Sequence, residues 1–93
     1  MEFEWNPKKA AQNLRKHKVS FAEAATVFSD SLGVTTADPD HSLEENRYII
    51  VGTSNRSRFL IVSFAERSTR IRIISARELT RSERKAYEEE NQK

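Results

Sequence analysis

RFLIVSF at residues 58–64 is an almost unbroken apolar run of the length of one β-strand. A run of this kind is typical of a strand that is buried on both faces of its sheet. A second run, IRIISA at residues 71–76, follows after a short turn at Ser68 and Thr69. Because so short a connection leaves no room for a crossover helix, the two runs predict neighbouring antiparallel strands.

Two more strands are expected on the N-terminal side of this pair. Residues 47–52 (RYIIVG) are separated from the first run by a turn at residues 54–57, and residues 32–36 are rich in β-branched side chains. The loop between these two strands contains Asp38-Pro39-Asp40-His41-Ser42, whose composition favours a turn. The close spacing of all four segments predicts an antiparallel meander.

The first third of the chain predicts a short strand or extended arm and two helices. The arm is formed by residues 3–5. Asn6-Pro7 is a strong helix start, since asparagine caps a helix and proline fits its first turn, and this helix should run to about Lys18. Serine and glutamate in residues 20–23 have the spacing of a capping box. A second, short helix should therefore start there and end near residues 29–30.

A further capping box, Thr80-Arg81-Ser82-Glu83, opens a last helix that should run to about Glu90. The predicted order is β-α-α-β-β-β-β-α. A four-stranded sheet must bury its apolar face, and the two N-terminal helices are available to cover it. The sequence therefore predicts one α+β domain over all 93 residues. In this domain, two N-terminal helices pack on a four-stranded antiparallel sheet, and a C-terminal helix follows.

Composition argues against several classes of site. The chain has no cysteine, which removes disulfides, thiolate catalysis and cysteine-based zinc sites. The motifs of P-loop, zinc-protease, hydrolase and dinucleotide sites are missing from the sequence. The acids and histidine of residues 38–41 could hold a divalent ion, but their composition favours a turn, so we expect no metal and no cofactor. No apolar run reaches the length of a membrane span and the first residues lack a signal-peptide pattern, so we expect a cytoplasmic protein without membrane contact.

Basic residues are concentrated in the second half of the chain, although the formal net charge is only +2. Residues 67–84 hold six arginines and two acids. A guanidinium group pairs with phosphate or carboxylate through two parallel hydrogen bonds. RNA, DNA or an acidic protein is therefore the expected partner. The alternative is a solvated basic face that only maintains solubility.

Two of these arginines are the first candidates for a functional site. Arg77 ends the last predicted strand, and Arg81 lies on the first turn of the last helix, whose N-terminus also attracts anions. Arg84, three residues after Arg81, can share that face. Arg72 lies on the opposite side of the pleat from Arg77. A twist or a bulge must therefore bring Arg72 and Arg77 together if both take part.

A histidine and a tyrosine are candidates for proton transfer. His17, between Lys16 and Lys18, is a candidate general base because imidazole changes its protonation near neutral pH. The alternative is a histidine that caps the carbonyl groups at the end of a helix. Tyr87 could stack on a base or donate its phenolic proton, or it could anchor the last helix to the sheet.

These residue types match one reaction that needs no metal. RNA carries its own nucleophile, the 2′-hydroxyl group. An enzyme has to align this group with the scissile bond, remove its proton, and stabilise charge on the phosphate with cations. Arginine is suited to the last of these tasks.

The chain resembles the BrnT family of bacterial toxins over roughly residues 2–87. The matching segments are Phe3-Glu4-Trp5, Asn13-Leu14-Arg15-Lys16-His17, Val19-Ser20-Phe21-Ala22-Glu23-Ala24, Asp38-Pro39-Asp40-His41-Ser42, Glu44 with Arg47, Gly52 and Ser54, and Ile71-Arg72-Ile73-Ile74-Ser75-Ala76-Arg77 with Arg81, Glu83, Arg84 and Tyr87. The sequence departs from the family at Lys18 and Ser57, where we would expect glycine. A left-handed turn at Lys18 would cost roughly 1 kcal/mol more than with glycine.

The resemblance implies a RelE-like fold and a type II toxin, a ribonuclease that inhibits translation. It implies a BrnA-like antitoxin as the protein partner, RNA as the substrate, and promoter DNA that is bound only through the toxin–antitoxin complex. Carried over by position, the catalytic candidates are Arg72, Arg77, Arg81, His17 and Tyr87. The candidates for RNA binding are Lys16, Arg67, Arg70 and Arg84. A non-catalytic basic module that binds an acidic protein or nucleic acid, and a toxin that has lost its activity, stay open as alternatives.

Overall fold

The computed structural model describes residues 1–41 and 46–91. Of residue 91 it describes the backbone alone. Ser42 and Glu44, which belong to the segments that resemble the BrnT family, lie outside the described residues. None of the described helices is long and apolar enough to cross a membrane.

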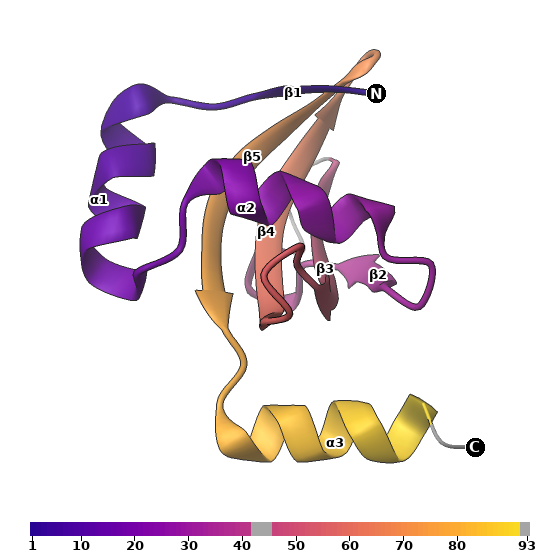
Figure 1. The fold of residues 1–93 in the computed structure, drawn as a ribbon. Coiled ribbons are helices and arrows are strands. Elements are labelled where there is room, and N and C mark those ends of the chain that lie inside the picture. The colour runs from indigo at the N-terminus through magenta and orange to yellow at the C-terminus, as the bar shows by residue number, and fades with distance from the viewer. Residues whose placement is uncertain (42–45, 92–93) are drawn as a thin grey trace.

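In the described part of the chain, one sheet contains five strands in the order β1-β5-β4-β3-β2 (Figure 1). Their bounds are β1 Glu2–Glu4, β2 Val34–Ala37, β3 Arg47–Thr53, β4 Phe59–Arg67 and β5 Arg70–Glu78. The pairs β2/β3, β3/β4 and β4/β5 are antiparallel. β1 pairs with β5 in parallel, so the sheet is mixed.

The prediction of a four-stranded, purely antiparallel sheet is wrong in one respect, because the N-terminal arm is a strand of the sheet. β1 satisfies backbone groups along the edge of β5 that β4 leaves open. Two ion pairs reinforce this pairing: Arg70 Nε lies 3.2 Å from a carboxylate oxygen of Glu2, and Arg72 Nη1 lies 2.9 Å from one of Glu4. Three residues are too few to show a strand pattern in the sequence, so this pairing could not be predicted.

The described residues form three α-helices and two short 3₁₀ turns. These are α1 Pro7–His17, α2 Phe21–Thr26, α3 Arg81–Asn91, η1 Val27–Ser29 and η2 Pro39–His41. The side chain of Asn6 caps α1 by accepting the N–H groups of Lys8 and Lys9 at 2.8 and 3.2 Å. Lys18 ends α1 in the left-handed conformation, with φ 60°.

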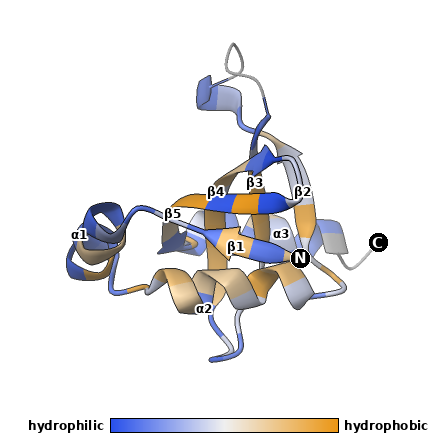
Figure 2. Cartoon of the chain, turned by 90° about the horizontal axis from the view of Figure 1, so that it is seen from above, coloured by the Kyte–Doolittle hydropathy of each residue, from blue (hydrophilic) through white to orange (hydrophobic). Residues whose placement is uncertain are grey.

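The three helices occupy different sides of the sheet. α2 lies across one face and is largely hydrophobic, whereas α1 lies beyond the β5 edge (Figure 2). The expectation that both N-terminal helices cover the same face is therefore wrong for α1. The physical reason is its composition: the buried side chain of α1 is the polar Asn13, whereas α2 buries Phe21 and Ala24.

The core fills the space between α2 and the sheet. Its buried apolar residues are Val19, Phe21, Ala24, Val27, Ile50, Leu60, Val62, Phe64, Ile73 and Ala76. The expectation that residues 58–64 are buried on both faces holds for one face only. Leu60 and Val62 are fully buried, but Ile61 and Ser63 are half-buried on the opposite face. This second face is the open face of the sheet, and its apolar side chains form the floor of a cavity.

A β-bulge in β5 changes which side chains share a face. Ser63 pairs with Ser75, but the next residue of β4, Phe64, pairs with Ile73, so Ile74 is an extra residue in the strand. Both Ile73 and Ala76 point into the core although they are three residues apart. The bulge therefore places Arg72 and Arg77 on the same open face.

The buried amide of Asn13 supports β5 next to this bulge. Its Oδ1 accepts the N–H of Ala76 at 3.0 Å, and its Nδ2 donates to the carbonyls of Ala76 and Val19 at 2.8 and 2.9 Å. These bonds satisfy the edge of β5 beyond the point where β1 ends. They also fix α1 against the strand, so the residues at the C-terminal end of α1 have a defined position over the open face.

Candidate functional site

A cavity of about 500 Å³ lies on the open face of the sheet, and we call it the histidine cavity. Its floor is formed by side chains of β3, β4 and β5, namely Ile49, Ile61, Ser63 and Ser75. Its walls come from three other places: the end of α1, the η2 turn, and the junction of β5 with α3. The wall residues are His17, Asp38, Pro39, Asp40, His41, Arg77 and Glu83.

The η2 turn places the side chain of His41 at the cavity, in contact with the carboxylate of Asp38. Nδ1 of His41 lies 3.0 Å from Oδ2 of Asp38, which is only 4% exposed. Asp38 is itself fixed, because its N–H donates to the Arg47 carbonyl at 3.2 Å and its Oδ1 accepts the N–H of Asp40 at 3.0 Å. An ionised Asp38 holds the proton on Nδ1 and leaves Nε2 able to accept another. This is the arrangement in which a carboxylate orients a general base.

Arg77 reaches the same cavity, and Glu83 holds its guanidinium group. Nη1 and Nη2 of Arg77 donate to the two carboxylate oxygens of Glu83 at 2.8 and 3.0 Å. The hydrogen bond with Arg77 lowers the pKa of Glu83 to about 2, helped by the backbone N–H of Thr80, and the pKa of Arg77 is raised in turn. Thr80 and Glu83 also form the predicted capping box of α3, with each side chain accepting the other's N–H. The start of α3 therefore sets the position of Arg77.

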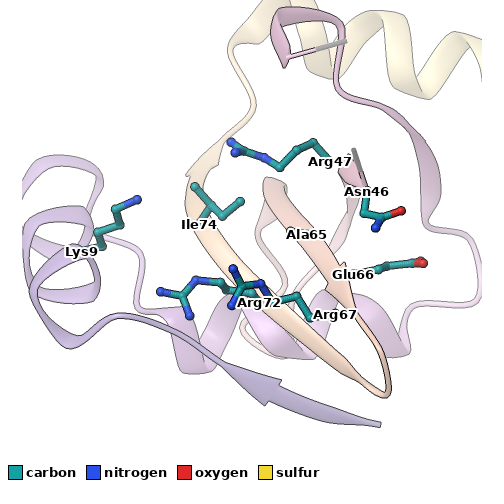
Figure 3. Close-up of a pocket in the computed structure, with 8 residues that line it drawn as sticks. All are labelled: Lys9, Asn46, Arg47, Ala65, Glu66, Arg67, Arg72 and Ile74. Atoms are coloured by element: carbon teal, nitrogen blue, oxygen red, sulfur yellow. The ribbon is translucent and has the colours of Figure 1, made fainter. Parts of the chain in front are cut away.

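A second cavity of about 420 Å³ lies beside the first on the same face, and we call it the arginine cavity (Figure 3). It is lined by Lys9, Asn46, Arg47, Ala65, Glu66, Arg67, Arg72 and Ile74. Arg72 and Arg77 thus lie on one face but in neighbouring cavities. Arg72 is also held by its ion pair with Glu4, at 2.9 Å.

Among the predicted catalytic residues, His17 and Arg77 are brought together in the histidine cavity. Arg81 is exposed on the first turn of α3 and belongs to the lining of neither cavity. Tyr87 occupies the position of an anchor, since its hydroxyl donates to the Leu32 carbonyl at 3.1 Å and its ring packs edge-on against Phe59 at 5.7 Å.

The predicted RNA-binding residues are spread over the surface. Arg67 lines the arginine cavity, and Lys16 lines a smaller hollow between α1 and β5. Arg70 pairs with Glu2 at the β1 edge. Arg84 bonds Glu88 at 3.1 Å and lies over the ring of Phe59. Arg70 and Arg84 are therefore placed away from both cavities.

Sequence reasoning missed the pairing of His41 with Asp38. The Asp-Pro-Asp-His motif was the available signal, but its composition is also that of an ordinary turn. Within residues 1–41 and 46–91, no group of three or more histidine and acidic side chains is placed to hold a metal ion.

Comparison with known proteins identifies the family. The family model of the ribonuclease toxin BrnT of type II toxin–antitoxin systems matches residues 5–83. The crystal structure of the Brucella abortus ribonuclease toxin BrnT is similar with a TM-score of 0.69 and 20% sequence identity, over 87% of this chain and 99% of that chain. No curated protein matches the chain at a significant level. The solved structure shows that the two chains share an α+β fold, and because the family model covers most of the sequence, the chain belongs to the BrnT family of ribonuclease toxins of type II toxin–antitoxin systems.

Proposed function

We propose that the chain is a metal-independent endoribonuclease that cleaves RNA by attack of the ribose 2′-hydroxyl on the adjacent phosphate. The observation that supports this most strongly is the content of the histidine cavity: two imidazoles, His17 and His41, and one guanidinium, Arg77. Two groups able to exchange protons near neutral pH, together with a cation, meet the needs of this reaction.

In the proposed reaction, His41 is the general base. Its Nε2 takes the proton of the 2′-hydroxyl, and Asp38 stabilises the resulting imidazolium. The 2′-oxygen forms a bond to phosphorus while the bond from phosphorus to the 5′-oxygen breaks. His17 gives a proton to that 5′-oxygen. The products are a 2′,3′-cyclic phosphate and a 5′-hydroxyl. We expected His17 to be the base from the sequence, but the contact of His41 with Asp38 favours the acid role for His17.

Arg77 stabilises the charge that develops on the phosphate oxygens. Its pair with Glu83 fixes the guanidinium plane before the substrate arrives, so little reorganisation is needed in the transition state. Arg72, two cross-strand rows further along the face, contacts a later phosphate of the same strand. Arg81 stabilises the same phosphate charge only weakly, through the long-range electrostatic effect of its positive charge. Tyr87 supports catalysis indirectly, by holding α3 against the sheet. These two residues are the weaker of the five catalytic candidates.

Cleavage of a defined RNA in EDTA tests this proposal. Wild-type protein should cut it and leave 2′,3′-cyclic ends, whereas His41→Asn should lower the rate about 100-fold or more. Protein prepared in the same way with Lys8→Gln, a charge change outside both cavities, is the matched control for folding and for contaminating ribonuclease. A requirement for magnesium, 3′-hydroxyl products, or equal rates for His41→Asn and wild type would contradict the mechanism.

One observation favours the alternative of a non-catalytic basic module. Four of the six candidate arginines are already paired with carboxylates: Arg70, Arg72, Arg77 and Arg84. A paired arginine offers a phosphate less attraction than a free one. Binding of RNA without any cleavage by the wild-type protein would favour this module over the enzyme.

We further propose a BrnA-like antitoxin as the cytoplasmic partner, with inhibition of translation as the result of free toxin. Membership of a type II toxin family supports a protein antitoxin in general. An acidic segment of the antitoxin would complement the open face, and promoter DNA would be bound only through the complex. Co-expression with the neighbouring reading frame should restore growth and allow co-purification. If the neighbour does neither while the chain alone is toxic, the antitoxin is a different protein.

A further inference from the structure

The two cavities of the open face are joined by a third hollow. A hollow of about 230 Å³ between α1 and β5 shares Lys9 and Ile74 with the arginine cavity, and His17 and Ser75 with the histidine cavity. The three spaces therefore lie next to one another, and we call them together the groove. It runs along the β5 edge from the arginine cavity to the histidine cavity.

One face of α1 forms a wall of this groove. Lys9, Gln12, Lys16 and His17 all line the central hollow. Their spacing of three, four and one residues places them along one side of a helix. Asn13, which lies on the same side, fixes this wall to β5 through its three bonds to backbone groups. The hydrogen bonds of Asn13 therefore fix the distance between α1 and β5 on the two sides of the groove.

The end of the groove remote from the histidines is strongly basic. Four cations of the arginine cavity, Lys9, Arg47, Arg67 and Arg72, are opposed in its lining by one acid, Glu66. They come from four different elements, and the side chains of Lys9 and Arg47 extend toward Ile74 from opposite sides (Figure 3). Cations that converge from separate elements attract a polyanion that follows the groove, because each can contact a different phosphate.

Side chains of neighbouring strands form cross-strand rows on the open face, and the distance between these rows is comparable to the distance between nucleotides of a strand. Arg47, Ala65 and Arg72 form one cross-strand row, and Ile49, Ser63 and Ser75 form the next row on the same face. Rows two residues apart along a strand are separated by roughly 6.6 Å. Stacked nucleotides rise roughly 3.4 Å along a strand, so one row corresponds to one or two nucleotides.

We infer that this groove binds a single RNA strand on one side of the scissile phosphate, with Lys9, Arg47 and Arg67 contacting phosphates beyond the one that reacts. Arg72 lies in the same cross-strand row as Arg47 and contacts the phosphates of the same part of the strand. The inference rests on the proposed ribonuclease function and adds that tight binding requires an RNA of a minimum length. Affinity rises with each nucleotide until the strand reaches the arginine cavity, and a dinucleotide does not reach Lys9 or Arg67.

Binding of RNA oligonucleotides of two, four and eight nucleotides tests the groove. Fluorescence anisotropy is measured against salt concentration, with His41→Asn in every protein so that cleavage is slow on the time scale of the measurement. In that background, Lys9→Gln and Arg67→Gln each remove one exposed cation from the groove, and both positions tolerate the change without disturbing the core. Lys8→Gln removes the same charge one residue away from Lys9 and outside the groove.

With the eight-nucleotide RNA, the slope of log affinity against log salt should fall by about 0.7 for each groove cation removed. Lys8→Gln should leave this slope unchanged, and none of the three changes should alter binding of the dinucleotide. The inference is overturned if Lys9→Gln and Lys8→Gln behave alike, or if affinity does not rise beyond two nucleotides. It is also overturned if Lys9→Gln weakens binding of the antitoxin but not of RNA. Failure of the ribonuclease proposal is recognised separately, since it is the absence of cleavage by the protein with His41 intact.

Discussion

Replacing Glu83 by glutamine tests whether the Arg77–Glu83 pair holds α3 to the sheet. The substitution keeps the shape of the side chain and removes its charge. It weakens two hydrogen bonds from Arg77, at 2.8 and 3.0 Å, and one from the N–H of Thr80, at 2.9 Å. Glu83→Gln should therefore destabilise the folded protein at neutral pH.

The size of this effect follows from the pKa of Glu83. A fall from the ordinary value of 4.5 to about 2 sets a ceiling of about 3.4 kcal/mol, at about 1.36 kcal/mol for each pKa unit. The side chains of Arg77 and Glu83 are each 39% exposed, so solvent screens much of this interaction. We expect a loss of about 1 kcal/mol in the free energy of unfolding at pH 7.

The pH dependence gives the sharper test. The folded-state pKa of Glu83 is lower than its unfolded value, so the pair stabilises the protein above pH 4.5. This contribution is lost as the pH falls from 4.5 toward 2. The difference between wild type and Glu83→Gln should therefore be constant from pH 5 to pH 7 and become small near pH 2.

Urea denaturation followed by the fluorescence of Trp5 measures this difference, because the indole packs edge-on against Phe21 in the core, with 6.0 Å between the ring centroids. Glu88→Gln is the matched control: Glu88 is also an α3 carboxylate bonded to an arginine, Arg84, but it caps no helix. A difference that is the same at pH 3 and pH 7, or equal losses for Glu83→Gln and Glu88→Gln, would refute the reasoning.

Four other substitutions give distinct expectations. Lys18→Gly should raise the free energy of unfolding by about 1 kcal/mol, because Lys18 has φ 60° and glycine adopts this conformation without strain; a thermal melt would show the gain. Asn13→Ala should cost about 3 kcal/mol, since it leaves the buried N–H and carbonyl of Ala76 without their partner, and urea denaturation would measure the loss. Arg77→Ala should slow RNA cleavage about 100-fold or more. Arg81→Ala, which changes a residue outside the cavities, should slow it by less than a factor of ten, and equal losses in the same assay would place Arg81 at the reacting phosphate.

The helix starts could be predicted because their signals are local. Asn6 and the Ser20 and Thr80 capping boxes are signals that act within one turn of chain. The Asn6 cap and the Thr80 box are formed as expected. Ser20 caps α2 by accepting the N–H of Glu23, but the Glu23 carboxylate, which should complete the box, accepts from Arg58 and Ser54 instead.

Three of the antiparallel strands could be predicted from their apolar runs, and the exposed β2, Val34–Ala37, from the β-branched side chains of residues 32–36. The pairing of β1 depends instead on a partner strand far along the chain. No property of residues 2–4 alone distinguishes an edge strand from a free arm.

The candidate site was only partly predictable for the same reason. The positions of Arg72 and Arg77 on one face depend on the bulge at Ile74, and nothing in the isoleucine-rich run marks where the extra residue falls. The role suggested for His41 depends on the buried Asp38 and on the Arg47 carbonyl that holds it. Residue types identified His17 and Arg77 as candidates, but only the packing of α1 against β5 brings them into one cavity.

The pairing of β1 with β5 has a consequence for the synthesis of this toxin. Glu4 bonds to Arg72, 68 residues further along the chain, and strands so far apart in sequence join late in folding because a large loop must close. On the ribosome the N-terminal residues emerge first, so β1 has no partner until the codons for β5 have been read. The groove combines residues of α1 with residues of β5, and Arg77 is fixed by α3, which is made later still. The order of translation therefore delays assembly of the proposed RNA-binding groove until most of the message has been used.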